Sequence, residues 1–229
     1  MKNTEPKKVL INGANGKMGR ALVRLISEQP QLGLTVAATR EAGQEIKTDF
    51  DIVIDFSTPQ GAQEAFLLAK KHHKAFLTGT TNLPATFLFQ MQQEEKIPVF
   101  FAPNVSLSVY FFTELAKQAA KMYNGYETHL HEIHHVHKKD APSGTAKNLA
   151  SAVNFPAEKV TYERIGETVG THEVKFSSPW DEITLTHQAT NRDLFAKSAL
   201  EIATWLVTCR AGFYTMSDYA KFKLKENKK

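Results

Sequence analysis

The stretch "KKVLINGANGKMGRALVRLISEQ", residues 7–29, decides the fold. It starts with a short apolar run, continues through a glycine-rich turn, and then places Met18, Leu22, Leu25 and Ile26 at helical spacing. This order indicates a strand, a tight turn and a helix, which together are the first half of a βαβ unit.

Further apolar runs extend this unit into a sheet. They are short and almost continuously apolar, as strands covered on both faces of a sheet are. Helical segments lie between the later runs, at 59–73 and 84–95. The expected strands are "LTVAATR" (34–40), "DIVIDFS" (51–57), "AFLTGT" (75–80) and "PVFFAPN" (98–104). We therefore expect residues 7–104 to form an α/β fold, a doubly wound parallel sheet.

The link between the second and third expected strands is unusually short. Ten residues separate Arg40 from Asp51. A parallel crossover that includes a helix generally needs about a dozen residues or more. We therefore expect "VLIN" (9–12) to lie between "TVAA" (35–38) and "DIVIDF" (51–56), with the usual outer strand missing.

A second pattern begins after residue 104. It comprises a helix at about 106–122, an alternating strand "YETHLHEIHHV" (126–136), a helix from Gly144, and a hairpin-like pair, "THEVKFSS" (171–178) and "EITLTHQA" (182–189). The helix 195–209 and the short segment 212–219 are expected to return to the first domain, because chain termini tend to lie together. The prediction is a first domain at 1–104, completed by 194–229, and an α+β domain at 105–193 with an antiparallel or mixed sheet.

Composition excludes several classes of function. The 229 residues are 42% hydrophobic, and no apolar run approaches the roughly 18 to 20 residues that span a bilayer. The polar start "MKNTEPKK" lacks the apolar centre of a signal peptide, so we expect a cytoplasmic protein without a membrane partner. The net charge of +4 includes the lysines of "KFKLKENKK", and no basic stripe with interleaved aromatic residues indicates nucleic-acid binding.

The glycine turn has the features of a dinucleotide site. Gly13 allows a tight turn, Gly16 allows backbone to approach a pyrophosphate, and Gly19 allows a helix to pack closely on a strand. The helix that follows offers unpaired amides to the phosphates, so Lys17 and Met18 are included in the predicted cofactor site. The spacing is GxxGxxG and not the commoner GxGxxG, so glycines that only turn a corner are the alternative.

The end of the second strand bears on which nicotinamide cofactor is used. NAD sites place an acid there for the ribose diol, and NADP sites place an arginine for the 2′-phosphate. The sequence has Thr39, Arg40 and Glu41. Arg40 can pair with a phosphate, whereas Glu41 keeps NADH possible. We expect NADPH to be used at least as well as NADH, and a plain surface ion pair is the alternative.

A cluster of imidazoles and lysines precedes a second glycine turn, in "HEIHHVHKKDAPSGTAKN" (131–148). It fits a metal site, a basic surface, or a pocket for an anion that must receive a proton. His131 and His135, or His134 and His137, have spacings that metal ligands can have. On a strand, however, residues four apart lie about 13 Å from each other, and Lys138 would repel an ion, so we predict no metal.

The same chain contains "DFS" (55–57), "TGTT" (78–81), "APN" (102–104) and "HHVHKKDAPSGTA" (134–146), and it resembles the dihydrodipicolinate reductase family. The resemblance continues through "RIGETVGTHEVKF" (164–176), "ITLTHQATNRDLFAKSAL" (183–200) and "GFYTMSD" (212–218), so it covers nearly the whole chain. It implies reduction of a cyclic dicarboxylate, 4-hydroxy-tetrahydrodipicolinate, with hydride from NADPH or NADH. It also implies a homotetramer assembled through the second domain, which would bind the substrate.

The resemblance implies roles for single residues. His134 and Lys138 correspond to the proton-donating pair, and His135 to a substrate-binding residue. Ser143, Gly144 and Thr145 correspond to a carboxylate cradle, and the nicotinamide contacts correspond to Gly79, Thr81, Ala102 and Asn104. Reducing a ring C=N adds hydride to carbon and leaves charge on nitrogen, so a proton must be delivered there. Two substrate carboxylates would account for the surplus of cations.

The sequence departs from the family pattern at three positions, and two other functions are alternatives. Family members often have an acid at Thr39 and a glycine at Asn82, and often a glycine where Asp181 precedes Glu182. One alternative is another two-domain NAD(P) reductase, such as an amino-acid dehydrogenase that acts on an imine. A second is a catalytically silent nucleotide-sensing protein, which would have no need to retain Lys138 or the Ser143 turn.

Overall fold

The computed structural model describes residues 5–41 and 48–226. The chain divides into two compact units, Met1–Val105 with Phe195–Lys229, and Ser106–Leu194. The unit boundaries fall one residue after the positions expected from the sequence. Among the helices in the described ranges, none combines the length and the hydrophobicity of a membrane span.

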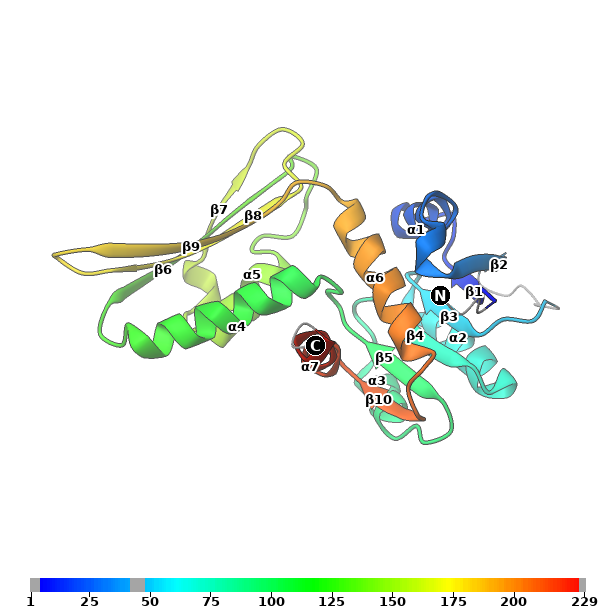
Figure 1. The fold of residues 1–229 in the computed structure, drawn as a ribbon. Coiled ribbons are helices and arrows are strands. Elements are labelled where there is room, and N and C mark those ends of the chain that lie inside the picture. The colour runs from blue at the N-terminus through cyan, green and yellow to red at the C-terminus, as the bar shows by residue number, and fades with distance from the viewer. Residues whose placement is uncertain (1–4, 42–47, 227–229) are drawn as a thin grey trace. The chain divides into compact units, whose positions relative to one another are not determined.

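The first unit contains a six-stranded parallel sheet (Figure 1). The strand order is β10-β5-β4-β3-β1-β2, and every neighbouring pair is parallel. The strands are β1 (Lys7–Asn12), β2 (Leu34–Arg40), β3 (Ile52–Asp55), β4 (Ala75–Thr78), β5 (Pro98–Phe101) and β10 (Gly212–Tyr214). The helices are α1 (Lys17–Glu28), α2 (Pro59–His72), α3 (Ala85–Gln92), α6 (Asp193–Leu206) and α7 (Met216–Glu226), with a 3-10 turn at Pro30–Leu32.

The position of β1 confirms the expected topology. It pairs with β2 on one side and with β3 on the other, so "TVAA" and "DIVIDF" are not neighbours. β2 is the last strand at that edge of the sheet. Most of the short link that motivated this prediction, 42–47, lies outside the described residues. β10 pairs with β5, so the C-terminal segment returns to the first unit as expected.

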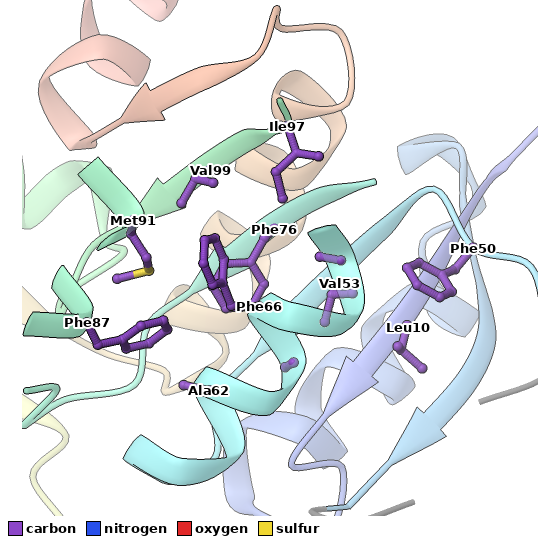
Figure 2. Close-up of a cluster of buried hydrophobic side chains, with 12 residues drawn as sticks. Leu10, Phe50, Val53, Ala62, Phe66, Phe76, Phe87, Met91, Ile97 and Val99 are labelled. Carbon is purple, nitrogen blue, oxygen red and sulfur yellow. The ribbon is translucent and has the colours of Figure 1, made fainter. Parts of the chain in front are cut away.

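Aromatic packing covers both faces of this sheet. Figure 2 shows Phe66 of α2 beside Phe76 of β4 and Phe87 of α3. The ring centroids of Phe76 and Phe87 lie 5.4 and 5.5 Å from that of Phe66. Side chains alternate along a strand, so Phe100 of β5 points away from this cluster. There it meets the ring of Trp205 from α6 at 6.3 Å. The resulting core fixes the carboxyl ends of the strands, where the glycine turn lies.

The second unit contains a four-stranded mixed sheet in the order β7-β6-β8-β9. β6 pairs antiparallel with β8, and β8 with β9, whereas β6 and β7 are parallel. Its elements are α4 (Leu107–Met122), β6 (Glu127–His134), α5 (Gly144–Ala152), β7 (Thr161–Arg164), β8 (Gly170–Ser177) and β9 (Glu182–Ala189), with a 3-10 turn at Ala157–Lys159.

One face of the second sheet is covered by α4 and α5, as Figure 1 shows. Burial alternates along β8, where His172, Val174 and Phe176 are buried. Leu130 of β6 and Leu149 of α5 belong to the same core. The side chains on the buried face of β6 therefore point toward the helices. After Leu130, the next two buried residues on this face are polar, Glu132 and His134.

Candidate active site

The turn from β6 into α5 brings together most of the residues expected to act on the substrate. Glu132 and His134 lie on the buried side of β6, with 0% and 7% of their surface exposed. The chain then turns back and enters α5, whose N-cap residue is Ser143. His135 is half-buried just beyond the strand, and Lys138 lies in the turn.

Lys138 has a defined partner in this turn. Its Nζ donates a hydrogen bond to Asp140 Oδ1 at 2.7 Å, and its backbone N–H bonds to the carbonyl of His135 at 3.1 Å. Burial alone would raise the pKa of Asp140, but the hydrogen bond and charge of Lys138 hold that pKa below its ordinary value. The ammonium group is therefore held at one place in the turn.

The N-terminus of α5 is the expected carboxylate cradle. Ser143 Oγ accepts a hydrogen bond from the backbone N–H of Ala146 at 3.1 Å, which caps the helix. Gly144 is exposed, and a Cβ there would meet no other atom within 4 Å. A helix N-terminus beside open space attracts an anion through its amides and dipole. This position suits the expected contact of Ser143, Gly144 and Thr145 with a substrate carboxylate.

Glu132 forms the centre of a buried polar cluster. Its Oε1 accepts hydrogen bonds from the backbone N–H of Ser143 at 2.9 Å and from Arg164 Nη2 at 3.1 Å. Its Oε2 lies 3.4 Å from His134 Nδ1 and 3.6 Å from His172 Nε2. Burial alone would raise the pKa of Glu132, but the hydrogen bonds from Ser143 and Arg164 and the nearby His134 hold it below its ordinary value.

The two histidines of this cluster are neutral near pH 7. Burial lowers the pKa of His134, although the charge of Glu132 opposes this shift. Burial, followed by the charge of His134, lowers the pKa of His172 to about 4. His135 also has a lowered pKa, because of burial and then the charge of Arg192. The site therefore combines neutral imidazoles with the carboxylates of Glu132 and Asp140, whose pKa values are lowered, and with the cations that pair with them.

Glu132, His134 and His172 also lie close enough together to hold a metal ion, since their ligand atoms are within 4.8 Å of one another. This set differs from the histidine pairs weighed from the sequence. The guanidinium of Arg164 already pairs with the same carboxylate, and a second cation beside it would be repelled. This arrangement favours a cluster that handles protons.

The first unit holds the glycine turn at the carboxyl end of β1. Gly13 has a φ of 80°, and a Cβ there would lie 2.7 Å from the carbonyl oxygen of Phe56. Gly16 caps α1, and a Cβ on Gly19 would collide with the Gly13 carbonyl. Gly13 and Gly19 therefore have no room for a side chain in this turn, and Gly16 provides the exposed N-cap position of α1.

The other residues expected to bind the cofactor lie at the same edge of the parallel sheet. Lys17 and Met18 start α1, with Lys17 exposed. Gly79 follows β4, and a Cβ there would overlap the ring of Phe56. Thr81 is exposed just beyond Gly79, and Ala102 and Asn104 follow β5. The carboxyl ends of strands are where open α/β sheets bind ligands.

Arg40, expected to pair with a 2′-phosphate or alternatively to form a surface ion pair, is buried. It is 5% exposed, and its guanidinium donates to Asn12 Oδ1 at 2.7 Å and to Glu64 Oε2 at 2.8 Å. Asn12 in turn donates to the buried carboxylate of Asp55 at 2.6 Å. Ser57, Thr78 and Thr80 also donate to Asp55. Arg40 is thus part of an internal network, in which the carboxylate of Glu64 compensates its charge.

Sequence reasoning missed three residues of the cluster in the second unit: Glu132, Arg164 and His172. One signal was present, since Glu132 and His134 are two apart in an alternating strand and so share its buried face. The partners come from other strands. His172 lies opposite Glu132 in the β6–β8 register, and Arg164 pairs with His134 across β6 and β7.

A parallel sheet with a glycine turn, joined to a separate unit that carries imidazoles, a lysine and a helix N-terminus, has the architecture of a two-domain nicotinamide-nucleotide-dependent reductase. The profile "Dihydrodipicolinate reductase, N-terminus" matches residues 7–105, and "Dihydrodipicolinate reductase, C-terminus" matches residues 108–219. The chain belongs to the dihydrodipicolinate reductase family.

Curated relatives agree with both profiles. The 4-hydroxy-tetrahydrodipicolinate reductase of Xanthomonas campestris pv. campestris (strain B100) is 37% identical over 233 residues, covering 94% of this chain and 98% of that protein. The enzyme of the same name from Campylobacter jejuni subsp. doylei is 34% identical over 237 residues, covering 93% and 96%. The likeness therefore extends over both units.

Solved structures show the same fold. The dipicolinate-bound dihydrodipicolinate reductase from Paenisporosarcina sp. TG-14 has a TM-score of 0.71 at 20% identity, covering 92% of this chain and 97% of that one. The DAP dehydrogenase of C. glutamicum, in complex with DAP, has a TM-score of 0.54 at 12% identity, covering 93% of each chain. At these identities the likeness concerns the fold alone.

Proposed function

We propose that this chain reduces 4-hydroxy-tetrahydrodipicolinate to tetrahydrodipicolinate in lysine and diaminopimelate biosynthesis, with hydride from NADH or NADPH. Overall, one hydride and one proton are consumed and the hydroxyl group leaves as water. The cofactor supplies the hydride when it is bound. The chain must therefore orient two carboxylates of the substrate and supply the proton.

The observation that carries this proposal is the single turn from β6 to α5. It holds His134, Lys138 and the N-terminus of α5 within one compact unit. Lys138 and His134 are the proposed proton carriers, and His135 and Thr145 are proposed to contact the substrate. A histidine or lysine can serve as a proton donor, and a helix N-terminus favours a carboxylate.

The nucleotide site is proposed to use Gly13, Gly16, Lys17, Met18 and Gly19. The proposed nicotinamide contacts are Gly79, Thr81, Ala102 and Asn104. Support comes from their common position at the carboxyl edge of the parallel sheet.

The positions of Arg40 and Glu41 in the structure bear on the preference between NADH and NADPH. Because Arg40 pairs inward with Asn12 and Glu64, it no longer supports a preference for the 2′-phosphate. Glu41 Oε1 instead accepts a hydrogen bond from the backbone N–H of Asn15 in the glycine turn, at 3.0 Å. A carboxylate at this place is suited to a ribose diol. We therefore propose that NADH is used at least as well as NADPH.

The direct test is NAD(P)H oxidation with substrate freshly generated by the preceding synthase reaction. We expect turnover with this substrate and none with a 2-oxo acid plus ammonia, the reaction of an amino-acid dehydrogenase. Cofactor binding without turnover of either substrate would instead favour the nucleotide-sensing alternative.

Assembly and location are part of the proposal through family membership. We propose a homotetramer formed through the second unit, located in the cytoplasm. Light scattering of the purified chain measures its mass in solution, and a monomer at assay concentration would contradict the proposed assembly.

A further inference from the structure

The buried carboxylate of Glu132 has an asymmetric environment. Oε1 receives two donors, the Ser143 N–H and the Arg164 guanidinium. Oε2 has no hydrogen-bond partner within normal geometry, although it lies 3.4 Å from His134 Nδ1 and 3.6 Å from His172 Nε2. A buried oxygen with only loose partners is costly, and such contacts can shorten when a site closes on its substrate.

The chemistry of the carboxylate determines where the imidazole protons lie. An ionised carboxylate oxygen offers only lone pairs, so the nitrogens that face Oε2 are favoured as N–H donors. For a neutral His134 this places the proton on Nδ1 and leaves a lone pair on Nε2. His172 then has its proton on Nε2, where Ser143 Oγ at 3.3 Å is a second partner.

The strand opposite His134 leaves room beside this nitrogen. Gly170 starts β8, and a Cβ at this position would lie 3.0 Å from His134 Nε2. Any larger residue would crowd the nitrogen that the carboxylate leaves unprotonated. Glu132 Oε2 thus faces His134 Nδ1 at 3.4 Å, and a carboxylate on this side of an imidazole can orient the ring for proton exchange at Nε2.

We propose that Glu132 is a positioning residue that keeps neutral His134 protonated on Nδ1, so that the lone pair on Nε2 accepts a proton from solvent water and passes it to the substrate. Through Oε1 the same carboxylate holds Ser143 and thereby the start of α5. The inference rests on the proposed function for the role of His134 in catalysis, but the proton positions themselves can be measured without turnover.

The first measurement is nitrogen-15 NMR of the full chain labelled at histidine. We expect His134 as the Nδ1–H tautomer and His172 as the Nε2–H tautomer near neutral pH. An Nε2–H tautomer for His134 in the wild-type chain would overturn the proposal. This result does not depend on any variant or on the identity of the substrate.

The variant Glu132→Gln sharpens the test. Ser143 N–H and Arg164 both donate to the Oε1 position, so they select the amide oxygen there and turn the amide NH₂ toward the histidines. The amide NH₂ then faces His134 Nδ1 as a donor, so we expect the tautomer of His134 to invert from Nδ1–H to Nε2–H. The inverted tautomer should lower kcat about 10- to 100-fold. Because the Ser143 N–H remains bonded to residue 132, KM for the dicarboxylate should change by less than about threefold.

The matched control is Glu163→Gln. Glu163 is an exposed carboxylate on β7 whose Oε1 lies 3.6 Å from His131 Nε2, so this variant alters a Glu–His pair on the same sheet. It should leave both the His134 tautomer and kcat unchanged. An inverted tautomer with unchanged kcat in Glu132→Gln would show that proton placement is not used in turnover, and would overturn the proposed role.

A metal ion is the competing occupant of this cluster. Protein purified without chelator should contain no stoichiometric transition metal, and activity should survive treatment with EDTA. A retained equivalent of metal, or loss of wild-type activity on chelation that zinc restores, would overturn the proposal in favour of a metal site.

Discussion

Lys138 is the residue whose substitution most directly separates chemistry from binding. Its Nζ is fixed by Asp140 in the turn before α5. Lys138→Met should lower kcat about 10²- to 10⁴-fold, the usual contribution of a positioned proton donor, without weakening cofactor binding. Steady-state kinetics and a cofactor titration measure the two quantities. Lys139→Ala, which removes a neighbouring exposed ammonium, should change neither.

Glu41 is expected to set the preference between the two cofactors. Its contact with the Asn15 amide keeps a carboxylate beside the glycine turn. Glu41→Gln should lower kcat/KM for NADH about tenfold, because a charge-assisted hydrogen bond to the ribose is weakened, and should affect NADPH less. Glu28→Gln, on the exposed side of α1, is the control. A uniform loss with both cofactors would contradict the assignment.

At the scale of single residues, contiguous motifs were predictable and long-range partners were not. His134, Lys138 and Ser143 lie within ten positions of one another, so their shared turn could be inferred from the sequence. Arg40 could not be placed in this way. Its partners Asn12 and Glu64 lie 28 and 24 positions away, and only the paired strands and the packed α2 bring them together.

At the scale of elements, the N-terminus of α5 has a structural and a proposed binding role. Ser143→Ala should lower the free energy of unfolding by about 1 kcal/mol, through loss of the N-cap. Ser106→Ala removes the equivalent cap of α4, where Ser106 Oγ accepts from Val109 N–H at 3.2 Å. Both should shift the urea midpoint similarly, but only Ser143→Ala should raise KM for the substrate. Equal KM values in the two variants would contradict the cradle.

The elements themselves were largely predictable because their signals are local. The glycine turn, the apolar strands and the short link at 41–50 were sufficient to predict the strand order around β1. In the second unit, alternation in β6 and the hairpin of β8 and β9 were also visible. The parallel pairing of β7 with β6 depends on a contact between residues about 30 positions apart, so no local pattern indicates it.

At the scale of the whole molecule, the proposed chemistry is divided between two units. The first holds the glycine turn and the residues proposed for hydride delivery, and the second holds the proposed proton carriers. Each unit is stabilised by its own core, so a substitution such as Glu132→Gln should leave NADH binding to the first unit intact even though kcat falls.

The buried imidazoles should make the stability of the chain depend on pH in a defined window. His172 has a pKa of about 4 in the folded chain, against an ordinary value of 6.5. Below pH 6.5 the unfolded chain therefore takes up a proton that the folded chain does not. The stabilisation is complete above that pH and is lost as the pH falls toward 4, by about 3 kcal/mol for this group.

Urea unfolding measured at about pH 7 and about pH 5 should therefore show a clear fall in the free energy of unfolding. His172→Gln should reduce this fall, because it removes a group whose pKa differs between the folded and the unfolded chain. The matched control is His137→Gln, which removes an imidazole whose side chain is 77% exposed. The pKa of Glu132 lies below the ordinary carboxyl value. The stabilisation from this group is therefore present above the ordinary carboxyl pKa and is lost only at lower pH. A pH dependence that is identical in wild type and His172→Gln would show that this imidazole does not take up its proton on unfolding.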